Sequence, residues 1–233
     1  AYDRVSTMFS PDGRLYQVEY ASKIVEQGTL GAGLVFNKGV VLGADKKVVS
    51  RLVMADSIEK VFRVDDHVAV IGSGLVGDAR RLVQIARKQA QENQMYYDEK
   101  IPVETLAKEI SAVKQLFTQY AGMRPFGVSF VVGGVDDSGA RLFETEPSGA
   151  LAEYKAIAIG KGKKECMKFF EAEYSDNMVL DDAIALMLKG LDKGMAADKQ
   201  KIDVNRLDFV IIEEGKQFER LPKQKLKAVL GKI

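Results

Sequence analysis

Pairs of short apolar runs, each pair joined by only a few turn-forming residues, constrain the fold of this chain most. Asn37-Lys38-Gly39 separates the first pair, and Asp65-Asp66 separates the second. Connections this short cannot carry a parallel crossover, so each pair must form an antiparallel hairpin. The predicted hairpins join residues 30–36 to 40–44, 60–64 to 67–71, 126–135 to 140–145, and 208–213 to 218–221.

Apolar residues at three- and four-residue steps predict helices between the hairpins. Near the N-terminus, Ser10-Pro11-Asp12-Gly13 supplies capping and turn residues, and the helical spacing then runs from Leu15 until Gly28 ends it. We therefore expect an N-terminal helix over residues 10–28. The other predicted helices cover residues 76–95, 103–120, 163–174, 180–193 and 222–230, and one further strand covers residues 151–159.

The order of these elements predicts how they are layered. Groups of hairpins alternate with pairs of consecutive helices. Because neighbouring strands pair locally, each group builds an antiparallel sheet, and each helix pair then covers the outer face of one sheet. We expect an α+β fold, a four-layer αββα sandwich. No repeat, low-complexity tract or Pro/Ser-rich linker divides the chain, so residues 1–233 are predicted to form a single domain.

Composition excludes several classes of partner. The 34 Lys and Arg residues nearly balance the 33 Asp and Glu residues, and the formal net charge of +1 gives no field that would recruit nucleic acid or a membrane surface. The single cysteine, Cys166, can form neither an internal disulfide nor a structural zinc site. With no membrane-spanning run or signal-peptide pattern, we expect a cytoplasmic protein. Because the chain begins at Ala1 and not at Met, we expect a processed, truncated or partial form.

Residues 72–77, Gly-Ser-Gly-Leu-Val-Gly, satisfy the G-x-G-x-x-G pattern of dinucleotide-binding turns. That fingerprint also needs a parallel strand after one helix, whereas here the predicted helix leads into a second helix. We therefore expect no dinucleotide, and no other cofactor. Two interpretations stay open for the glycines: a close approach of strand and helix, which small residues permit, or a role in peptide binding.

Thr29, Asp45 and Lys60 stand at three predicted strand ends, where a hydroxyl, a carboxylate and an amine can meet. A threonine becomes a strong nucleophile when its own free α-amine acts as the base and a nearby lysine adjusts the local charge. In the uncleaved chain, Thr29 is internal and its nitrogen is an amide. We therefore expect no catalytic residue, and only cleavage after Gly28 would reverse this.

Other candidates for catalysis or metal binding are weaker. His67 is the only histidine and no Ser or Cys in a recognised nucleophile elbow accompanies it, so we interpret it as a solvated turn residue. The neighbouring acids Glu144 and Glu146, like Asp181 and Asp182, are interpreted as surface carboxylates. We expect no metal site.

The N-terminal sequence strongly resembles the signature of proteasome α-type subunits. The residues that carry the resemblance are YDR at 2–4 and FSPDGRLYQVEYA at 9–21. The likeness continues through GVVL at 39–42, DKK at 45–47, IEK at 58–60, SGL at 73–75, DAR at 78–80, RPFGVS at 124–129 and PSG at 147–149. It covers nearly the whole chain and is most similar to the archaeal subunits whose rings contain one subunit type.

The resemblance implies the N-terminal-nucleophile hydrolase fold with an extra N-terminal helix. Residues 1–9 would then be a gate segment, residues 10–28 the extra helix and residues 29–233 the sandwich. In the family, this helix lies across the cleft in which β-type relatives hold their catalytic threonine, and the α ring is not proteolytic. Thr29, Asp45 and Lys60 would be vestiges of the β-type arrangement.

The resemblance also implies a place in the 20S core particle. Seven α subunits form a ring that caps the proteolytic β ring, gates the entry of unfolded protein and docks a regulatory ATPase or another activator, in support of ATP-dependent protein degradation. Tyr2, Asp3, Pro11 and Tyr20 match the gate positions of the family. A frayed terminus is the alternative for these residues.

Lys60, Gly74 and Leu75 match the pocket that receives the C-terminal tail of an activator. Lys60 would meet the terminal carboxylate, and Gly74 with Leu75 would admit a hydrophobic side chain. The alternative for Lys60 is an exposed ion pair with Glu59. For the whole chain, the alternative is a β-type N-terminal-threonine peptidase that cleavage between Gly28 and Thr29 activates.

Overall fold

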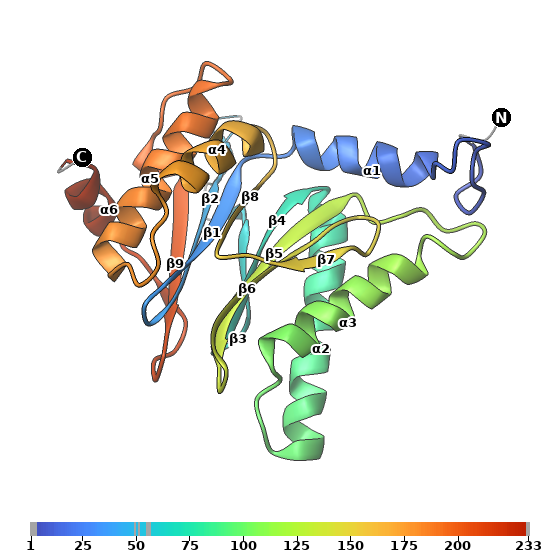
Figure 1. Ribbon diagram of the computed structural model, residues 1–233, viewed down its shortest axis with the longest axis horizontal. Helices are drawn as coiled ribbons and strands as arrows, with labels where there is room; N and C mark the ends of the chain where they lie inside the picture. Colours follow the sequence, from blue (N-terminus) through green and yellow to red (C-terminus); the bar gives the residue numbers. More distant parts are fainter. Residues whose placement is uncertain (1–3, 49, 51, 55–56, 232–233) are drawn as a thin grey trace.

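The strands form two antiparallel sheets that face each other (Figure 1). The computed structural model describes residues 4–48, 50, 52–54 and 57–231. In order across the first sheet, the strands are β10 (Glu219–Arg220), β9 (Leu207–Glu213), β2 (Gly39–Asp45), β1 (Gly31–Phe36) and β8 (Ala156–Ile159). Across the second sheet they are β3 (Val61–Asp65), β4 (Val68–Gly74), β5 (Val128–Asp136), β6 (Gly139–Thr145) and β7 (Leu151–Glu153).

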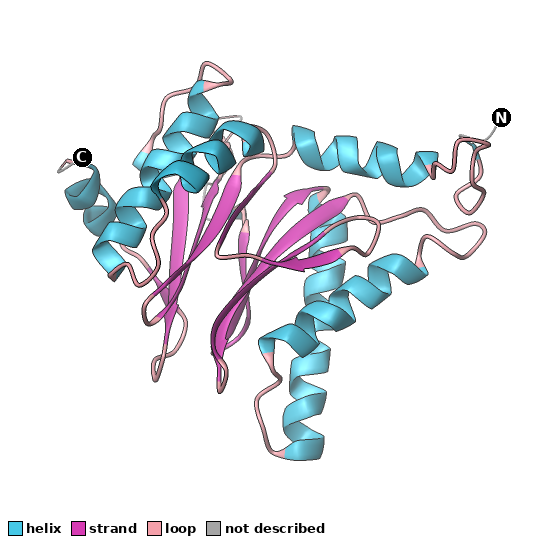
Figure 2. Cartoon of the chain, viewed as in Figure 1, coloured by secondary structure: helices cyan, strands magenta, loops and turns pink. Residues whose placement is uncertain are grey.

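Helices cover the outer face of each sheet, as Figure 2 shows. The helices on the second sheet are α2 (Val76–Tyr97) and α3 (Val103–Leu116), and those on the first are α4 (Lys163–Glu173), α5 (Leu180–Ala196) and α6 (Lys223–Leu230). A short 3-10 turn, Val204–Arg206, precedes β9. The predicted four-layer αββα sandwich is confirmed.

The core has three apolar layers. Two lie between the outer face of a sheet and the helices that cover it, and the third lies between the two sheets. Leu34, Phe170 and Leu188 belong to the layer between the first sheet and its helices. Leu82, Ile110 and Phe130 belong to the corresponding layer of the second sheet, and Leu42, Ile71 and Val131 lie between the sheets. Since alternate residues of a strand point to opposite faces, the runs that are apolar throughout are those buried on both faces.

Helix α1 (Tyr16–Gln27) lies across one end of the sandwich, next to β4 and β5 (Figure 1). It is shorter than the predicted helix over residues 10–28. Residues 10–14 form a turn in which the Gly13 amide donates to the Ser10 carbonyl at 2.8 Å, and Gly13 has a φ of +75°. This left-handed conformation delays the start of the helix.

The predicted strand over residues 151–159 is divided between the two sheets. The Tyr154 amide donates to Leu142 O of the second sheet at 2.9 Å, whereas the Lys155 carbonyl accepts from Val35 of the first sheet at 2.8 Å. The chain therefore crosses between the sheets from β7 to β8. A single apolar run cannot reveal this crossing, because pairing with distant strands decides it.

The interpretation of His67 as a solvated turn residue is wrong. Its side chain is buried, with 4% exposed, and its Nε2 lies 2.8 Å from the carbonyl oxygen of Ile101. Nδ1 has no hydrogen-bond partner in the described part of the chain and lies 3.6 Å from Asp65 Oδ2. The histidine thus joins the β3–β4 hairpin to the segment that leads into α3, a contact between positions far apart in the sequence.

Candidate functional site: the strand ends beneath helix α1

Lys60 directly precedes β3, and the structure buries it. Its exposed fraction is 9%, and it makes no ion pair or hydrogen bond through its side chain with the described residues. The expected alternative, an exposed pair with Glu59, is therefore wrong; Glu59 lies 4.0 Å from Arg220 instead. Burial lowers the pKa of the Lys60 ammonium, and the negative charge of Asp45 raises it in part.

Gly74 ends β4 at a point where the backbone must pass close to another strand. Its φ is +119°, and a Cβ at this position would lie 2.1 Å from the Gly127 carbonyl oxygen. The Leu75 amide donates to the same oxygen at 2.9 Å. The Asp78 carboxylate fixes the junction from the other side, because it accepts from the Gly127 amide at 2.9 Å and from the Arg124 guanidinium. Gly74 therefore permits a close approach between the end of β4 and the segment before β5, and not the predicted approach of strand and helix.

The structure brings Lys60 and Gly74 together at one small pocket, which Phe62 and Val76 also line. Leu75 does not line this pocket, although it follows Gly74 directly and is 39% exposed. The pocket thus combines a buried cation, a backbone without a side chain and apolar walls. Glu59 lines the pocket as well, and the volume of about 10 Å³ leaves room within the single chain for no more than about one water molecule.

The residues of the possible catalytic set also lie near one another. Thr29 and Asp45 line a shared pocket, and the Thr29 hydroxyl is buried without a hydrogen-bond partner among the residues that the structure describes. The Asp45 carboxylate, however, is bound by Arg206 through hydrogen bonds of 3.0 and 2.6 Å. Burial raises the pKa of the Asp45 carboxyl, while the hydrogen bonds from Arg206 lower it. Arg206 therefore binds the Asp45 carboxylate. Sequence patterns do not reveal this pair, because the position of Arg206 depends on the pairing of β9 with β2.

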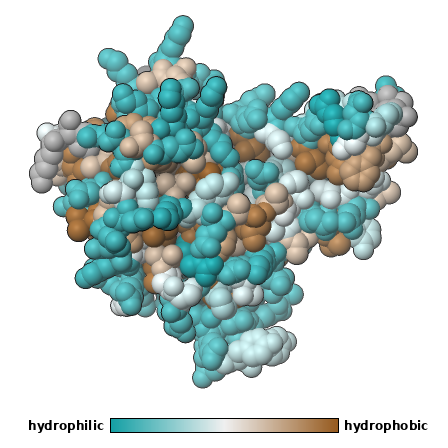
Figure 3. Space-filling model, viewed as in Figure 1, coloured by the Kyte–Doolittle hydropathy of each residue, from teal (hydrophilic) through white to brown (hydrophobic). Residues whose placement is uncertain are grey.

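Two of the four predicted gate residues are described. Pro11 lies in the turn before α1, and Tyr20 lies on α1 with 42% of its side chain exposed and its ring stacked on Tyr16. Tyr2 and Asp3 lie outside the described residues. Figure 3 shows apolar surface near the N-terminal end of the described chain. The exposed apolar side chains of this segment are Val5, Met8 and Phe9.

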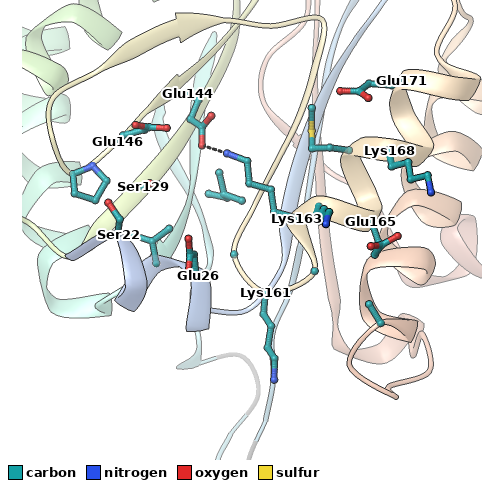
Figure 4. A pocket seen from close by; sticks show the side chains of 18 residues that line it. Ser22, Glu26, Ser129, Glu144, Glu146, Lys161, Lys163, Glu165, Lys168 and Glu171 are labelled. Carbon is teal, nitrogen blue, oxygen red and sulfur yellow. Dashed lines mark hydrogen bonds and ion pairs between the residues drawn. The ribbon is translucent and has the colours of Figure 1, made fainter. Parts of the chain in front are cut away.

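A larger cavity of about 850 Å³ lies between the C-terminal half of α1 and the start of α4 (Figure 4). Glu144 lines it and is 4% exposed, so its interpretation as a surface carboxylate is wrong. It pairs with Lys163, whose Nζ lies 2.7 Å from Glu144 Oε1. Glu146 is exposed and lines the same cavity.

Among the described residues, no group of three or more His, Cys, Asp or Glu side chains is arranged to hold a metal ion. A search of the same residues finds no helix with the length and apolar character required to cross a membrane.

Comparisons with known proteins give a consistent result. The family described as "Proteasome subunit" matches residues 25–212, and the N-terminal signature of the A-type proteasome subunits matches residues 2–23. The chain is 48% identical over 233 residues to a proteasome alpha subunit of Methanoregula boonei, which covers 100% of this chain and 96% of the relative. Identity to the proteasome alpha subunit of Methanocaldococcus jannaschii is 47% over 234 residues, covering 100% of this chain and 88% of the relative. For the Methanopyrus kandleri protein of the same name, identity is 44% over 233 residues, with 100% and 93% covered.

These similarities decide between the two subunit types. The matched N-terminal signature lies upstream of Thr29, in the part of the chain that a β-type precursor would lose on cleavage. The named relatives are alpha subunits and cover the full chain, so the β-type alternative is not favoured. The chain belongs to the proteasome subunit family, as a non-catalytic subunit of the α type.

Proposed function

We propose that this chain forms a seven-membered ring with other α subunits in the cytoplasm and that the ring caps a proteolytic β ring. Similarity to alpha subunits over the whole chain supports the assembly. In this particle the β ring supplies the threonine-peptidase activity. The α ring restricts the entry of unfolded protein substrate and docks a regulatory ATPase or another activator.

The docking role rests on one observation, the buried ammonium of Lys60 without an ion-pair partner among the described residues. Asp45 acts on this ammonium only at a distance, so a charge with so little contact with water still costs free energy, and a carboxylate that binds there offsets this cost. The C-terminal carboxylate of an activator tail is such a group. Gly74 lines the same pocket, and Leu75, which follows it, offers an apolar contact.

The test of docking is Lys60→Ala in the particle assembled with its β subunits. We expect ATPase-stimulated protein degradation to fall by about tenfold or more, since a charge-assisted hydrogen bond contributes roughly 1.5–3 kcal/mol. Basal hydrolysis of short peptides should not change. The matched control is Lys38→Ala, which removes an exposed lysine from the β1–β2 turn. Undiminished stimulation in Lys60→Ala particles of normal size would refute the docking role.

The gating role is a separate proposal for Tyr2, Asp3, Pro11 and Tyr20. A short terminal segment next to exposed apolar surface can order around a pore or leave it at little energetic cost. Deletion of residues 1–9 should therefore raise basal peptide hydrolysis by the complete particle severalfold without any activator. A deletion that leaves the rate unchanged, in particles with the same mass per ring, would refute the gate.

A further inference from the structure

The cavity beneath α1 is a second concave site, distinct from the Lys60 pocket, with which it shares no lining residue. Its volume of about 850 Å³ falls in the range typical of ligand-binding pockets. The walls come from α1, the end of β6 and the loop that leads from β8 into α4, as Figure 4 shows. It opens at the end of the space between the two sheets.

Two polar residues stand at the ends of the inner faces of β5 and β6. Val131 of β5 and Leu142 of β6 point into the layer between the sheets. By strand alternation, Ser129 and Glu144 share these faces and line the cavity. Ser129 is 3% exposed and its hydroxyl forms no hydrogen bond with the described residues. The hydroxyl faces the cavity and water can reach it there, because the described side-chain atoms that are both buried and without a hydrogen-bond partner are Thr29 Oγ1, His67 Nδ1 and Ser111 Oγ. It is therefore available to a polar ligand that enters the cavity.

In the ion pair of Glu144 with Lys163, only the lysine side chain is partly exposed to solvent. Lys163 is the first residue of α4, where the positive end of the helix dipole disfavours a cation. Its side chain is 40% exposed, whereas that of Glu144 is 4% exposed. Lys163 can therefore return to water while Glu144 cannot. A second cation can take its place without leaving the carboxylate unpaired.

The charges and apolar side chains of the other lining residues indicate which kind of cation could bind. Glu26 and Glu146 lie on the same side of the cavity as Glu144, and Lys161 points away from it (Figure 4). Apolar side chains of the cavity can contact an aliphatic stem; they are Val25, Pro147, Ile159 and Met167. Lys164 and Lys168 of α4 line the cavity as well, so its acidic character is confined to the side that carries Glu26, Glu144 and Glu146. On that side the Ser129 hydroxyl has no hydrogen-bond partner among the described residues.

We propose that this cavity binds an arginine side chain of a partner polypeptide. The guanidinium replaces Lys163 at the Glu144 carboxylate and donates a further hydrogen bond to the Ser129 hydroxyl, while the methylene stem lies against Val25 and Met167. Arginine fits better than lysine, because its planar fork offers five donors and is more weakly hydrated. The proposal is independent of the docking role of Lys60.

The test is a fluorescence anisotropy titration of the full chain, in the oligomeric state in which it purifies. The probe is a labelled acetyl-Leu-Arg-Leu-amide, and the control probe carries citrulline, the uncharged isostere of arginine. We expect saturable binding that is at least about tenfold tighter for arginine than for citrulline. Glu144→Gln should weaken arginine binding about tenfold and Ser129→Ala severalfold, whereas Lys163→Met should strengthen it because the competing cation is gone.

Glu171→Gln is the matched control, since Glu171 lines the same cavity from α4, across from Glu144 (Figure 4). It should bind the arginine probe as the wild type does. Equal binding of both probes, equal effects of Glu144→Gln and Glu171→Gln, or no saturable binding would each overturn the proposal. If Glu144→Gln does not fold, Ser129→Ala and Lys163→Met give the same decision.

Discussion

Lys114 of α3 is a charged residue in the apolar layer between the helices and the second sheet. It is fully buried, and its ammonium donates to the carbonyls of Val128 and Thr145 at 3.0 and 2.9 Å and to the Thr145 hydroxyl at 2.7 Å. These bonds tie α3 to β5 and β6. Burial lowers the pKa of Lys114 to about 7, and Glu144 and Glu146 raise it in part.

Replacement of Lys114 should show how this buried amine changes stability with pH. An unfolded lysine keeps its proton up to a pKa of about 10.4, whereas folded Lys114 loses it near pH 7. Between these values the unfolded chain binds more protons, so the Lys114 contribution to the free energy of unfolding rises with pH. The free energy of unfolding of the wild type, minus that of Lys114→Met, should therefore increase from pH 7 to pH 9, by at most about 1.4 kcal/mol per pH unit.

Urea unfolding at several pH values measures this difference. Lys108→Met is the control, because Lys108 lies on the same helix and is exposed with Glu104 as its partner. The difference in the free energy of unfolding between Lys108→Met and the wild type should stay constant between pH 7 and pH 9. A flat difference for Lys114→Met as well would mean that Lys114 keeps its proton in the folded state.

At the scale of elements, the junction between β4 and α2 requires a glycine at position 74 but not at position 77. Gly74→Ala places a side chain in a left-handed conformation and against the Gly127 carbonyl, so the free energy of unfolding should fall by at least about 2 kcal/mol. Gly77 lies in the first turn of α2, and a Cβ at this position would meet no atom within 4 Å. Gly77→Ala should therefore be neutral, or stabilising by up to about 1 kcal/mol.

Thermal or urea unfolding of both variants tests the close approach at this junction. Equal stability of Gly74→Ala and Gly77→Ala would contradict it. Activator binding by a folded Gly74→Ala chain would separate the packing role of this residue from its proposed docking role.

Local sequence patterns predicted the helices and strands whose ends depend on nearby residues. They did not predict features that depend on contacts between residues far apart in the sequence. Tight turns revealed the hairpins, and periodicity revealed the helices. The change of sheet between Tyr154 and Lys155 depends on hydrogen bonds to Leu142 and Val35, which no local pattern encodes. On α3 the apolar spacing was visible, but it gave no sign that Lys114 lies on the buried face of the helix.

At the scale of the whole molecule, the candidate site was predictable only in part. The resemblance pointed to Lys60 and Gly74, and the structure places both at one pocket. It did not point to Arg206, whose guanidinium binds the Asp45 carboxylate, and it assigned no role to Ser129 or Glu144 in the cavity beneath α1. These residues become neighbours only when the two sheets meet. Sequence reasoning therefore finds residues that a family signature marks and misses those that tertiary packing assembles.

Helix α1 contributes little to the fold of the single chain, which suggests a role between chains. Its buried side chains are Ala21 and Val25, whereas Tyr20 and Ile24 are exposed. Burial of two small apolar side chains contributes only about 2–4 kcal/mol. A chain without residues 1–27 should therefore still fold, with a lower melting temperature.

The same truncated chain should fail to form the ring, because the exposed face of α1 would be lost from the contacts between subunits. Native mass spectrometry measures the size of the assembly, and circular dichroism during heating measures the fold. The matched control is deletion of residues 1–9, which keeps α1 and should leave the ring intact. If the chain without residues 1–27 assembled to the same number of subunits as the control, α1 would not be a ring-forming element, and its exposed residues Tyr20 and Ile24 would need a different partner.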